Sequence, residues 1–302
     1  MIACSTSWNQ KNHDDIGDAV REILDLGFDG VELGHGIHAP DIEKLLKLRE
    51  RLDFRVSSLH CFCPAPPESR TGNPNSYQFT SHRAGVRERA VTLVNRTIDT
   101  ARKFGARCVV VHAGNIHTMK VTPELLKLLE EGKLLGKRYA KVKLDAVLAR
   151  ERKIELYMRR TLDCLAAIAE HAATMNILVG IENRQDFEDM PAEWEFEEMF
   201  RRLDAPHVGY WHDFGHAQIK HNLGFIDHVQ WLDRIGSCTF GAHVHDVQWP
   251  VKDHLAPFMG EVRFEALIPK LPSDADFIFE MTRDVKAEEV AISLERWRKT
   301  FP

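Results

Sequence analysis

Seven acidic and histidine side chains stand where short apolar runs end, and together they could hold a cation and move protons. The runs read SSLH, VVHAG, VGIEN, GYWHD, GAHVHD and IFEMT, and the polar residues are His60, His112, Glu182, Asp213, His243, His245 and Glu280. Carboxylates and imidazoles gathered in one cavity would repel one another or be poorly solvated unless a cation lies among them. This mixture of ligands suits Mn²⁺, Mg²⁺, Co²⁺ or Zn²⁺, although histidine weighs against Mg²⁺ alone. We therefore predict one divalent metal ion as the cofactor.

The elements that must position these side chains alternate between strand-like and helix-like patterns. Eight short runs predict strands at Ile2–Ser5, Gly30–Leu33, Arg55–His60, Cys108–His112, Ile177–Glu182, Val208–Asp213, Gly241–Asp246 and Phe277–Met281. Between them apolar residues recur at helical spacing, as in the segments that begin near Ile16, Ala90 and Met158. Such repeated alternation predicts parallel strands joined by right-handed crossover helices.

This alternation predicts an α/β fold with a single domain over residues 1–302, a (β/α)8 TIM barrel. A chain of 302 residues is usual for one such barrel. The alternative is an open doubly wound sheet, which normally has a glycine-rich turn after its first strand, and the segment CSTSWNQKN contains no glycine. In a barrel the carboxyl ends of the strands meet at one mouth, so the polar strand ends would converge there.

One segment, at about residues 117–154, interrupts the alternation. Between Lys120 and Lys153 it carries ten Lys and Arg residues against five Asp and Glu residues. We predict a helical insertion after the fourth strand, on the side of the barrel mouth. A solvated helical segment, a basic lid and a dimer contact are its alternative roles.

The overall composition excludes several classes of protein. A formal net charge of −5 argues against a dedicated nucleic-acid binder. No apolar run approaches membrane-spanning length, and the first residues, MIACS, lack the pattern of a signal peptide. The six cysteines have no framework spacing and fit reduced thiols. We expect a cytoplasmic protein without membrane or nucleic-acid partners, and leave a homo-oligomer open.

The segments VVHAG, IEN, HDFGHA and HVHD…KDHLAPFMGEVRFEAL resemble the xylose isomerase-like TIM-barrel superfamily. That superfamily holds sugar isomerases and epimerases, inosose and dehydroshikimate dehydratases, and AP endonucleases. The resemblance runs from GFDGVELG to FIFEMT and leaves out the insertion. It implies that Glu182, Asp213, His243 and Glu280 hold the metal, with Glu182 and Glu280 also serving as the catalytic acid and base.

The resemblance also implies a set of residues that bind the substrate. His60 and His112 match substrate-binding positions of the sugar enzymes, and His216 matches a histidine that contacts substrate or a further metal. For His216 and His245 the alternative is support of the metal ligands. The residues themselves add Arg184, Glu32, Trp211 and His254 as substrate-binding candidates around the mouth. For Trp211 the alternative is packing, and for Arg184 it is an ion pair with Asp186.

The function that these residues favour is a divalent-metal-dependent isomerase or epimerase acting on a sugar, polyol or related keto compound. The reaction would proceed by proton abstraction through a metal-stabilised enediolate. A dehydratase (lyase) acting on an inosose or dehydroshikimate-like substrate begins with the same abstraction and stays open. A zinc-dependent AP endonuclease-type phosphodiesterase would require an Asp two residues before His254, where Lys252 stands. An inactive binding barrel is the last alternative.

The substrate itself is expected to be a small carbohydrate-like molecule. No glycine-rich turn that would cradle a phosphate lies near the last two strands, which favours an unphosphorylated substrate. Family epimerases tend to read PPGxG after the loop histidine, and here Phe258 replaces the first of those glycines. This difference is typical of a loop that closes over a different or more apolar substrate.

Overall fold

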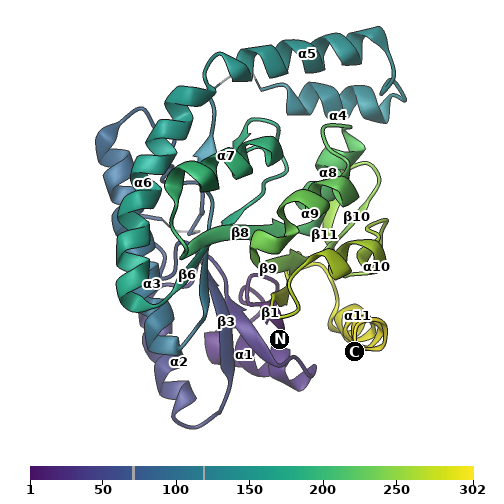
Figure 1. The fold of residues 1–302 in the computed structure, drawn as a ribbon. Helices are drawn as coiled ribbons and strands as arrows, with labels where there is room; N and C mark the ends of the chain where they lie inside the picture. Colours follow the sequence, from purple (N-terminus) through teal and green to yellow (C-terminus); the bar gives the residue numbers. More distant parts are fainter. Residues whose placement is uncertain (70–71, 118–119) are drawn as a thin grey trace.

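The computed structural model describes residues 1–69, 72–117 and 120–302. Within them, parallel strands close a barrel in the order β1-β12-β9-β8-β6-β4-β3-β2 (Figure 1). The barrel strands are β1 (Ile2–Ser5), β2 (Gly30–Leu33), β3 (Arg55–His60), β4 (Cys108–Val111), β6 (Leu178–Glu182), β8 (Val208–Asp213), β9 (Thr239–Val244) and β12 (Asp276–Phe279). The predicted TIM barrel is thereby confirmed, and the open doubly wound sheet is excluded because β12 pairs with β1.

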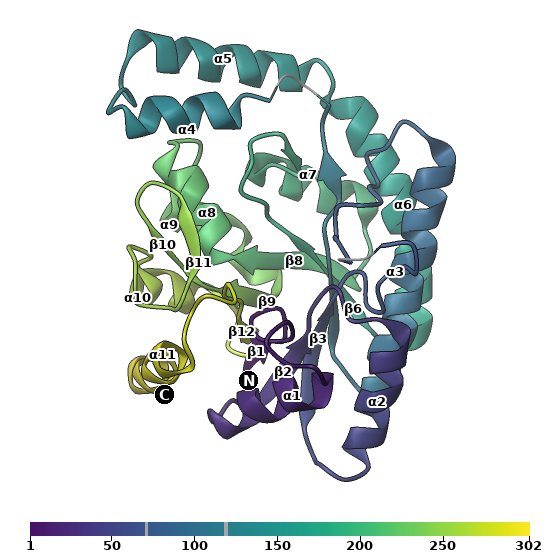
Figure 2. The same cartoon turned by 180° about the vertical axis from the view of Figure 1, so that it is seen from behind.

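Helices cover the outside of this barrel (Figures 1 and 2). They are α1 (Ile16–Asp25), α2 (Ala39–Arg49), α3 (Ala84–Phe104), α6 (Ile154–Met175), α7 (Glu193–Leu203), α8 (Phe214–Asn222), α9 (His228–Ile235), α10 (Phe264–Leu267) and α11 (Ala287–Thr300), with short 3₁₀ turns at Gly236–Cys238 and Ile268–Lys270. The helical patterns expected near Ile16, Ala90 and Met158 lie in α1, α3 and α6, where these residues are buried. No helix in the described ranges has an apolar stretch long enough to cross a membrane.

The seventh barrel strand ends two residues earlier than expected. It spans Thr239–Val244 instead of Gly241–Asp246, and Asp246 opens a hairpin of β10 (Asp246–Gln248) and β11 (Lys252–Leu255). The carboxylate of Asp246 accepts hydrogen bonds from the backbone N–H groups of Val247, Gly260 and Val262. A side chain that bonds to neighbouring backbone in this way favours a turn over a strand.

The predicted helical insertion after the fourth strand is confirmed as α4 (Thr122–Glu130) and α5 (Lys137–Glu151), although its residues 118–119 lie outside the described residues. Both helices lie above the mouth end of the barrel (Figure 1). The insertion is bound to the mouth loops, because Tyr139 donates to the carbonyl of Leu223 (2.7 Å) and Thr122 Oγ1 donates to Glu188 (2.6 Å). A small sheet of β5 (Gly114–Asn115) and β7 (Asp189–Met190) joins two further loops.

The interior of the barrel beneath the mouth is filled by Trp211. The indole is 1% exposed and packs with Ala3, Cys108, Val110 and Ile278 in the barrel interior. Glycines on both neighbouring strands make room for it. A Cβ atom at Gly180 would lie 3.0 Å from the Trp211 side chain, and one at Gly241 would lie 2.5 Å from it.

Replacing Gly241 with alanine is expected to lower the free energy of unfolding by about 1–3 kcal/mol, because the added methyl group overpacks the rigid indole ring. Urea unfolding monitored by circular dichroism measures this change. Gly85→Ala is the matched control, since a Cβ there meets nothing within 4 Å and the residue lies in α3. The control should be neutral or stabilising. Equal midpoints for Gly241→Ala and the wild type would contradict the packing account.

Candidate metal centre

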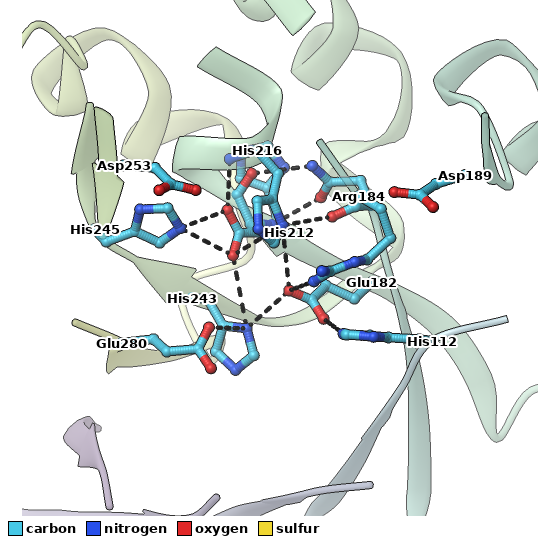
Figure 3. Close-up of polar contacts among 12 residues, drawn as sticks. His112, Glu182, Arg184, Asp189, His212, His216, His243, His245, Asp253 and Glu280 are labelled. Atoms are coloured by element: carbon cyan, nitrogen blue, oxygen red, sulfur yellow. Dashed lines mark hydrogen bonds and ion pairs between the residues drawn. The ribbon is translucent and has the colours of Figure 1, made fainter. Parts of the chain in front are cut away.

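Four side chains from four strands converge at the mouth of the barrel. Glu182 and Asp213 end β6 and β8, His243 lies in β9, and Glu280 follows β12 directly. One possible ligand atom from each lies within 4.8 Å of the others, and all four residues are buried. His243 Nδ1 lies 3.2 Å from Glu182 Oε1, 3.2 Å from Glu280 Oε2 and 3.8 Å from Asp213 Oδ2 (Figure 3). The structure therefore brings the predicted ligand set together.

His243 is oriented by a carboxylate on its far side. Its Nε2 lies 3.1 Å from Glu32 Oε2, which also accepts a hydrogen bond from Ser58 Oγ (2.7 Å). A proton on Nε2 leaves the Nδ1 lone pair facing three carboxylates, an arrangement that fits a divalent cation. Burial alone would lower the pKa of His243, but the carboxylates of Glu280 and Glu32 raise it well above its usual value. Positive charge is thus favoured at this position, whether an imidazolium or a metal carries it.

The carboxylate of Glu182 receives several polar contacts. Its Oε2 lies 2.6 Å from His112 Nε2 and 3.4 Å from His60 Nε2, and its Oε1 lies 3.3 Å from Arg184. Burial alone would raise the pKa of Glu182, but Arg184 and His112 hold it well below its usual value. The pKa of Glu280 is also lowered, because His243 and His60 outweigh the effect of burial. Both carboxylates are therefore ionised, as a metal ligand or general base requires.

Asp213 is held by the start of α8 and by His245. Its Oδ1 accepts hydrogen bonds from the backbone N–H of His216 (2.7 Å) and from His245 Nε2 (3.0 Å). His245 Nδ1 accepts the backbone N–H of His254 (2.9 Å), so the neutral ring carries its proton on Nε2 and donates to Asp213. Gly215 leaves room for this ring, since a Cβ there would lie 1.9 Å from His245. These contacts favour a supporting role for His245.

His216, His245 and His254 form a second histidine group, with nitrogen atoms within 4.8 Å of one another. His245 already uses both nitrogens. The ring of His254 stacks on His245 at 4.0 Å, and its Nδ1 lies 3.0 Å from Asp253 Oδ2. Burial alone would lower the pKa of His254, but the hydrogen bond to Asp253 raises it to about 9. This group therefore presents a positively charged imidazole at the rim instead of three free lone pairs.

The Asp253–His254 pair is expected to make stability depend on pH. Because the folded-state pKa of His254 is about 9 and the unfolded value is about 6.5, the pair stabilises fully below pH ~6.5 and loses its effect as the pH rises through ~9. The contribution is at most about 3 kcal/mol. Urea unfolding of the wild type and Asp253→Asn at pH 6 and pH 10 checks this. The wild type should be the more stable protein at pH 6, with a smaller difference at pH 10; a constant difference would contradict the assignment.

Two of the predicted substrate-binding residues lie beneath the metal ligands. Glu32 is fully buried against His243 and Ser58, and Trp211 packs in the barrel interior with its ring 5.3 Å from that of His243. The structure thus favours a supporting role for Glu32 and packing for Trp211. His60, His112, Arg184, His216 and His254 lie around the ligand set itself.

Sequence reasoning gave no role to Asn183 or Asp189. Asn183 Oδ1 accepts the backbone N–H of Asp213 (2.8 Å), and its Nδ2 donates to the Asp213 carbonyl (3.0 Å). Its position directly after Glu182 in VGIEN was the available signal. Asp189 lies beside Arg184 in Figure 3, and burial raises its pKa to about 6. It belongs to β7, which no periodic pattern marks.

The comparisons with known proteins agree with the barrel fold. The family model described as xylose isomerase-like TIM barrel matches residues 20–300. An uncharacterized protein of Sinorhizobium fredii, y4fM, is 21% identical over 332 residues, covering 98% of this chain and 95% of that protein.

Solved structures share the fold at low sequence identity. A D-tagatose 3-epimerase-like protein superposes with a TM-score of 0.71 at 19% identity, covering 99% of this chain and 96% of the other. The 3-keto-D-glucoside 4-epimerase of E. coli gives 0.72 at 16% identity, with 99% and 98% covered. The IOLI protein with a zinc atom gives 0.68 at 12% identity, with 98% and 95% covered.

Proposed function

Because the chain belongs to the xylose isomerase-like TIM-barrel family, we propose that it is a divalent-metal-dependent isomerase or epimerase acting on an unphosphorylated sugar, polyol or related keto compound. The observation that carries the proposal is the meeting of Glu182, Asp213, His243 and Glu280 ligand atoms within 4.8 Å. The epimerases among the structures of the same fold support a carbohydrate-like substrate.

The residues of the site have distinct roles in this proposal. A divalent cation, Mn²⁺, Mg²⁺, Co²⁺ or Zn²⁺, would supply Lewis-acid polarisation of neighbouring substrate oxygens. Glu182 and Glu280 are the proton-transfer pair: one removes the proton from the carbon beside the carbonyl, and the other returns a proton. Their lowered pKa values keep both carboxylates ionised in the free site, so either can remove the proton, and the one that returns a proton must first take it up from solvent or substrate.

The groups around these carboxylates orient the substrate. His112 stays neutral because burial and the charge of Arg184 lower its pKa. Its one N–H faces Glu182 Oε2 at 2.6 Å, so His112 orients that carboxylate. Arg184 and the cationic His254 are the donors that remain for substrate oxygens. Two cationic donors suit hydroxyl and carbonyl oxygens that gain negative charge during proton abstraction.

Solvent-deuterium exchange into a panel of sugars, inositols and keto acids tests the proposal. The metal-loaded enzyme should place deuterium at a carbon next to a carbonyl in at least one compound, even without net turnover. A product that has lost water would identify a dehydratase of the same family instead. No exchange or turnover with any member, in a protein that binds the cation, would count against the proposal.

An abasic-site oligonucleotide separates the phosphodiesterase alternative. That activity relies on a cluster of three zinc ions, and here the second histidine group has Lys252 where an acidic ligand would stand. The oligonucleotide should remain intact after incubation with the zinc-loaded protein.

A further inference from the structure

The outer face of β8, which points away from the metal centre, is polar. Tyr210 and His212 alternate with Trp211 and Asp213 along the strand, and both are fully buried. Strands of a parallel barrel are normally apolar on both faces, and buried polar groups require partners. Tyr210 and His212 face away from the metal ligands, so the metal centre does not explain why buried polar residues stand there.

A run of hydrogen bonds begins at the metal ligand Asp213 and passes through this outer face. Asn183 binds the backbone of Asp213 at both its N–H (2.8 Å) and its carbonyl (3.0 Å). Asn183 Oδ1 also lies 2.8 Å from the hydroxyl of Tyr210. The Tyr210 oxygen in turn contacts His212 Nδ1 (2.9 Å) and Trp231 Nε1 (3.1 Å). Figure 3 shows His212 among the residues drawn around the site.

The run continues outward through α9 and α8 to the β10–β11 hairpin. His212 Nε2 lies 3.1 Å from His228 Nε2, and His228 Nδ1 lies 3.4 Å from Gln218 Oε1. Gln218 Nε2 donates to Asn222 Oδ1 (3.0 Å), and Asn222 Nδ2 donates to the carbonyl of Pro250 (2.8 Å). Every member of this outer part has a partner on each side.

The direction of each hydrogen bond follows from the two ends of the run. At the inner end, the Asp213 N–H fixes Asn183 Oδ1 as an acceptor, so the Tyr210 hydroxyl donates to it. Tyr210 oxygen then accepts from His212 Nδ1–H, and His212 Nε2 accepts from His228 Nε2–H. Burial lowers the pKa of His228 to about 3, so its ring is neutral and its Nδ1 carries no proton.

At the outer end, the Pro250 carbonyl is an acceptor and requires the Asn222 amide as its donor. Gln218 must then donate to Asn222, which leaves Gln218 Oε1 facing His228 Nδ1. Both atoms at this contact are acceptors, and their separation of 3.4 Å is the longest distance in the run. The hydrogen bonds are thus continuous from Asn183 to His228 and interrupted between His228 and Gln218.

We propose that the buried run Asn183–Tyr210–His212–His228 positions Asp213 and so sets the metal affinity of the site, whereas Gln218 and Asn222 take no part. This inference rests on the proposed function, since it assumes a cation held by Asp213. The physical reason is that Asn183 fixes the Asp213 backbone from both sides, and Tyr210 fixes Asn183. Partners that orient metal ligands typically change metal affinity by 10–100-fold.

Titration of Mn²⁺ into the folded protein, by calorimetry and by competition with a chelator, tests this. Tyr210→Phe and His228→Leu should each weaken Mn²⁺ binding about 10-fold. The double variant should be no weaker than the more affected single variant, because both changes break one cooperative run. Gln218→Met, beyond the interruption, should bind within about twofold of the wild type, the spread of independent sites.

Tyr139→Phe is the control for loss of a buried hydroxyl group. Tyr139 lies in α5 and donates one hydrogen bond, to the carbonyl of Leu223. It is buried like Tyr210, at 3% exposure against 0%. It should lower thermal stability without changing Mn²⁺ affinity. Should Tyr210→Phe fail to fold, Trp231→Phe is the second variant, which removes the N–H donor to Tyr210 together with part of the buried indole ring. Weaker Mn²⁺ binding in Trp231→Phe than in Tyr139→Phe would support the inference, and equal binding would contradict it.

The outcomes are distinct. A wild type that binds no Mn²⁺ overturns the proposed function and this inference with it. If the wild type binds Mn²⁺ while Tyr210→Phe and His228→Leu lose thermal stability but keep wild-type affinity, that result overturns this inference alone. Equal weakening in Gln218→Met and His228→Leu would also overturn it, since the interruption would then have no effect.

Discussion

Replacing Glu280 with glutamine is expected to reduce deuterium exchange at the substrate carbon by at least about 100-fold, with the fold retained. Glu280 follows β12, and its Oε2 lies 3.2 Å from His243 Nδ1. An amide of the same size keeps the packing but cannot accept the proton. The measurement is the rate of exchange for whichever compound the wild type labels, at saturating metal.

Glu265→Gln is the matched control, because Glu265 is exposed in α10. The control should exchange at the wild-type rate. Thermal unfolding of both variants separates a loss of chemistry from a loss of fold. Retained exchange in Glu280→Gln would remove this residue from the proton-transfer pair and leave Glu182 as its remaining member.

Replacing His243 with alanine is expected to weaken Mn²⁺ binding by at least about 100-fold. This is more than the weakening expected when a group that only orients a ligand is removed. His243 supplies the one imidazole in the four-residue set, and its removal leaves three carboxylates facing one another. The metal content of the dialysed protein measures the effect directly.

Thermal unfolding gives a second measure of the same loss. A cation at 100 times its dissociation constant should stabilise the wild type by about 2.7 kcal/mol, because it binds only the folded state. His243→Ala should show no such gain. His171→Ala, which removes a half-buried histidine paired with Asp99 on α3, should behave like the wild type. Full metal content in His243→Ala would mean that the cation lies elsewhere.

The barrel and the approximate place of the ligands were predictable because two repeating patterns coincide. Short apolar runs mark strands, and a polar residue at the carboxyl end of each run marks the mouth. Glu182 and Asp213 end their strands as expected. His243 lies one residue before the end of β9, and Glu280 follows the end of β12 directly, so these strand ends differ from the predicted ones. Both side chains nevertheless reach the ligand set.

What the sequence could not reveal are contacts that join distant segments. Glu32 reaches Nε2 of His243 across the barrel, from a position 211 residues away. The proton position of His245 depends on the backbone N–H of His254, and no side-chain pattern records that hydrogen bond. Asn183 lies next to a predicted ligand, but its function depends on the backbone of another strand. Such roles follow from three-dimensional contacts instead of residue spacing.

The most direct test of the shared cation is the anomalous scattering of manganese in crystals of the protein grown with Mn²⁺. The account predicts one strong peak within bonding distance of Glu182, Asp213, His243 and Glu280. A peak held by His216 and His254 instead, or no peak at the mouth of the barrel in a well-ordered crystal, would contradict it.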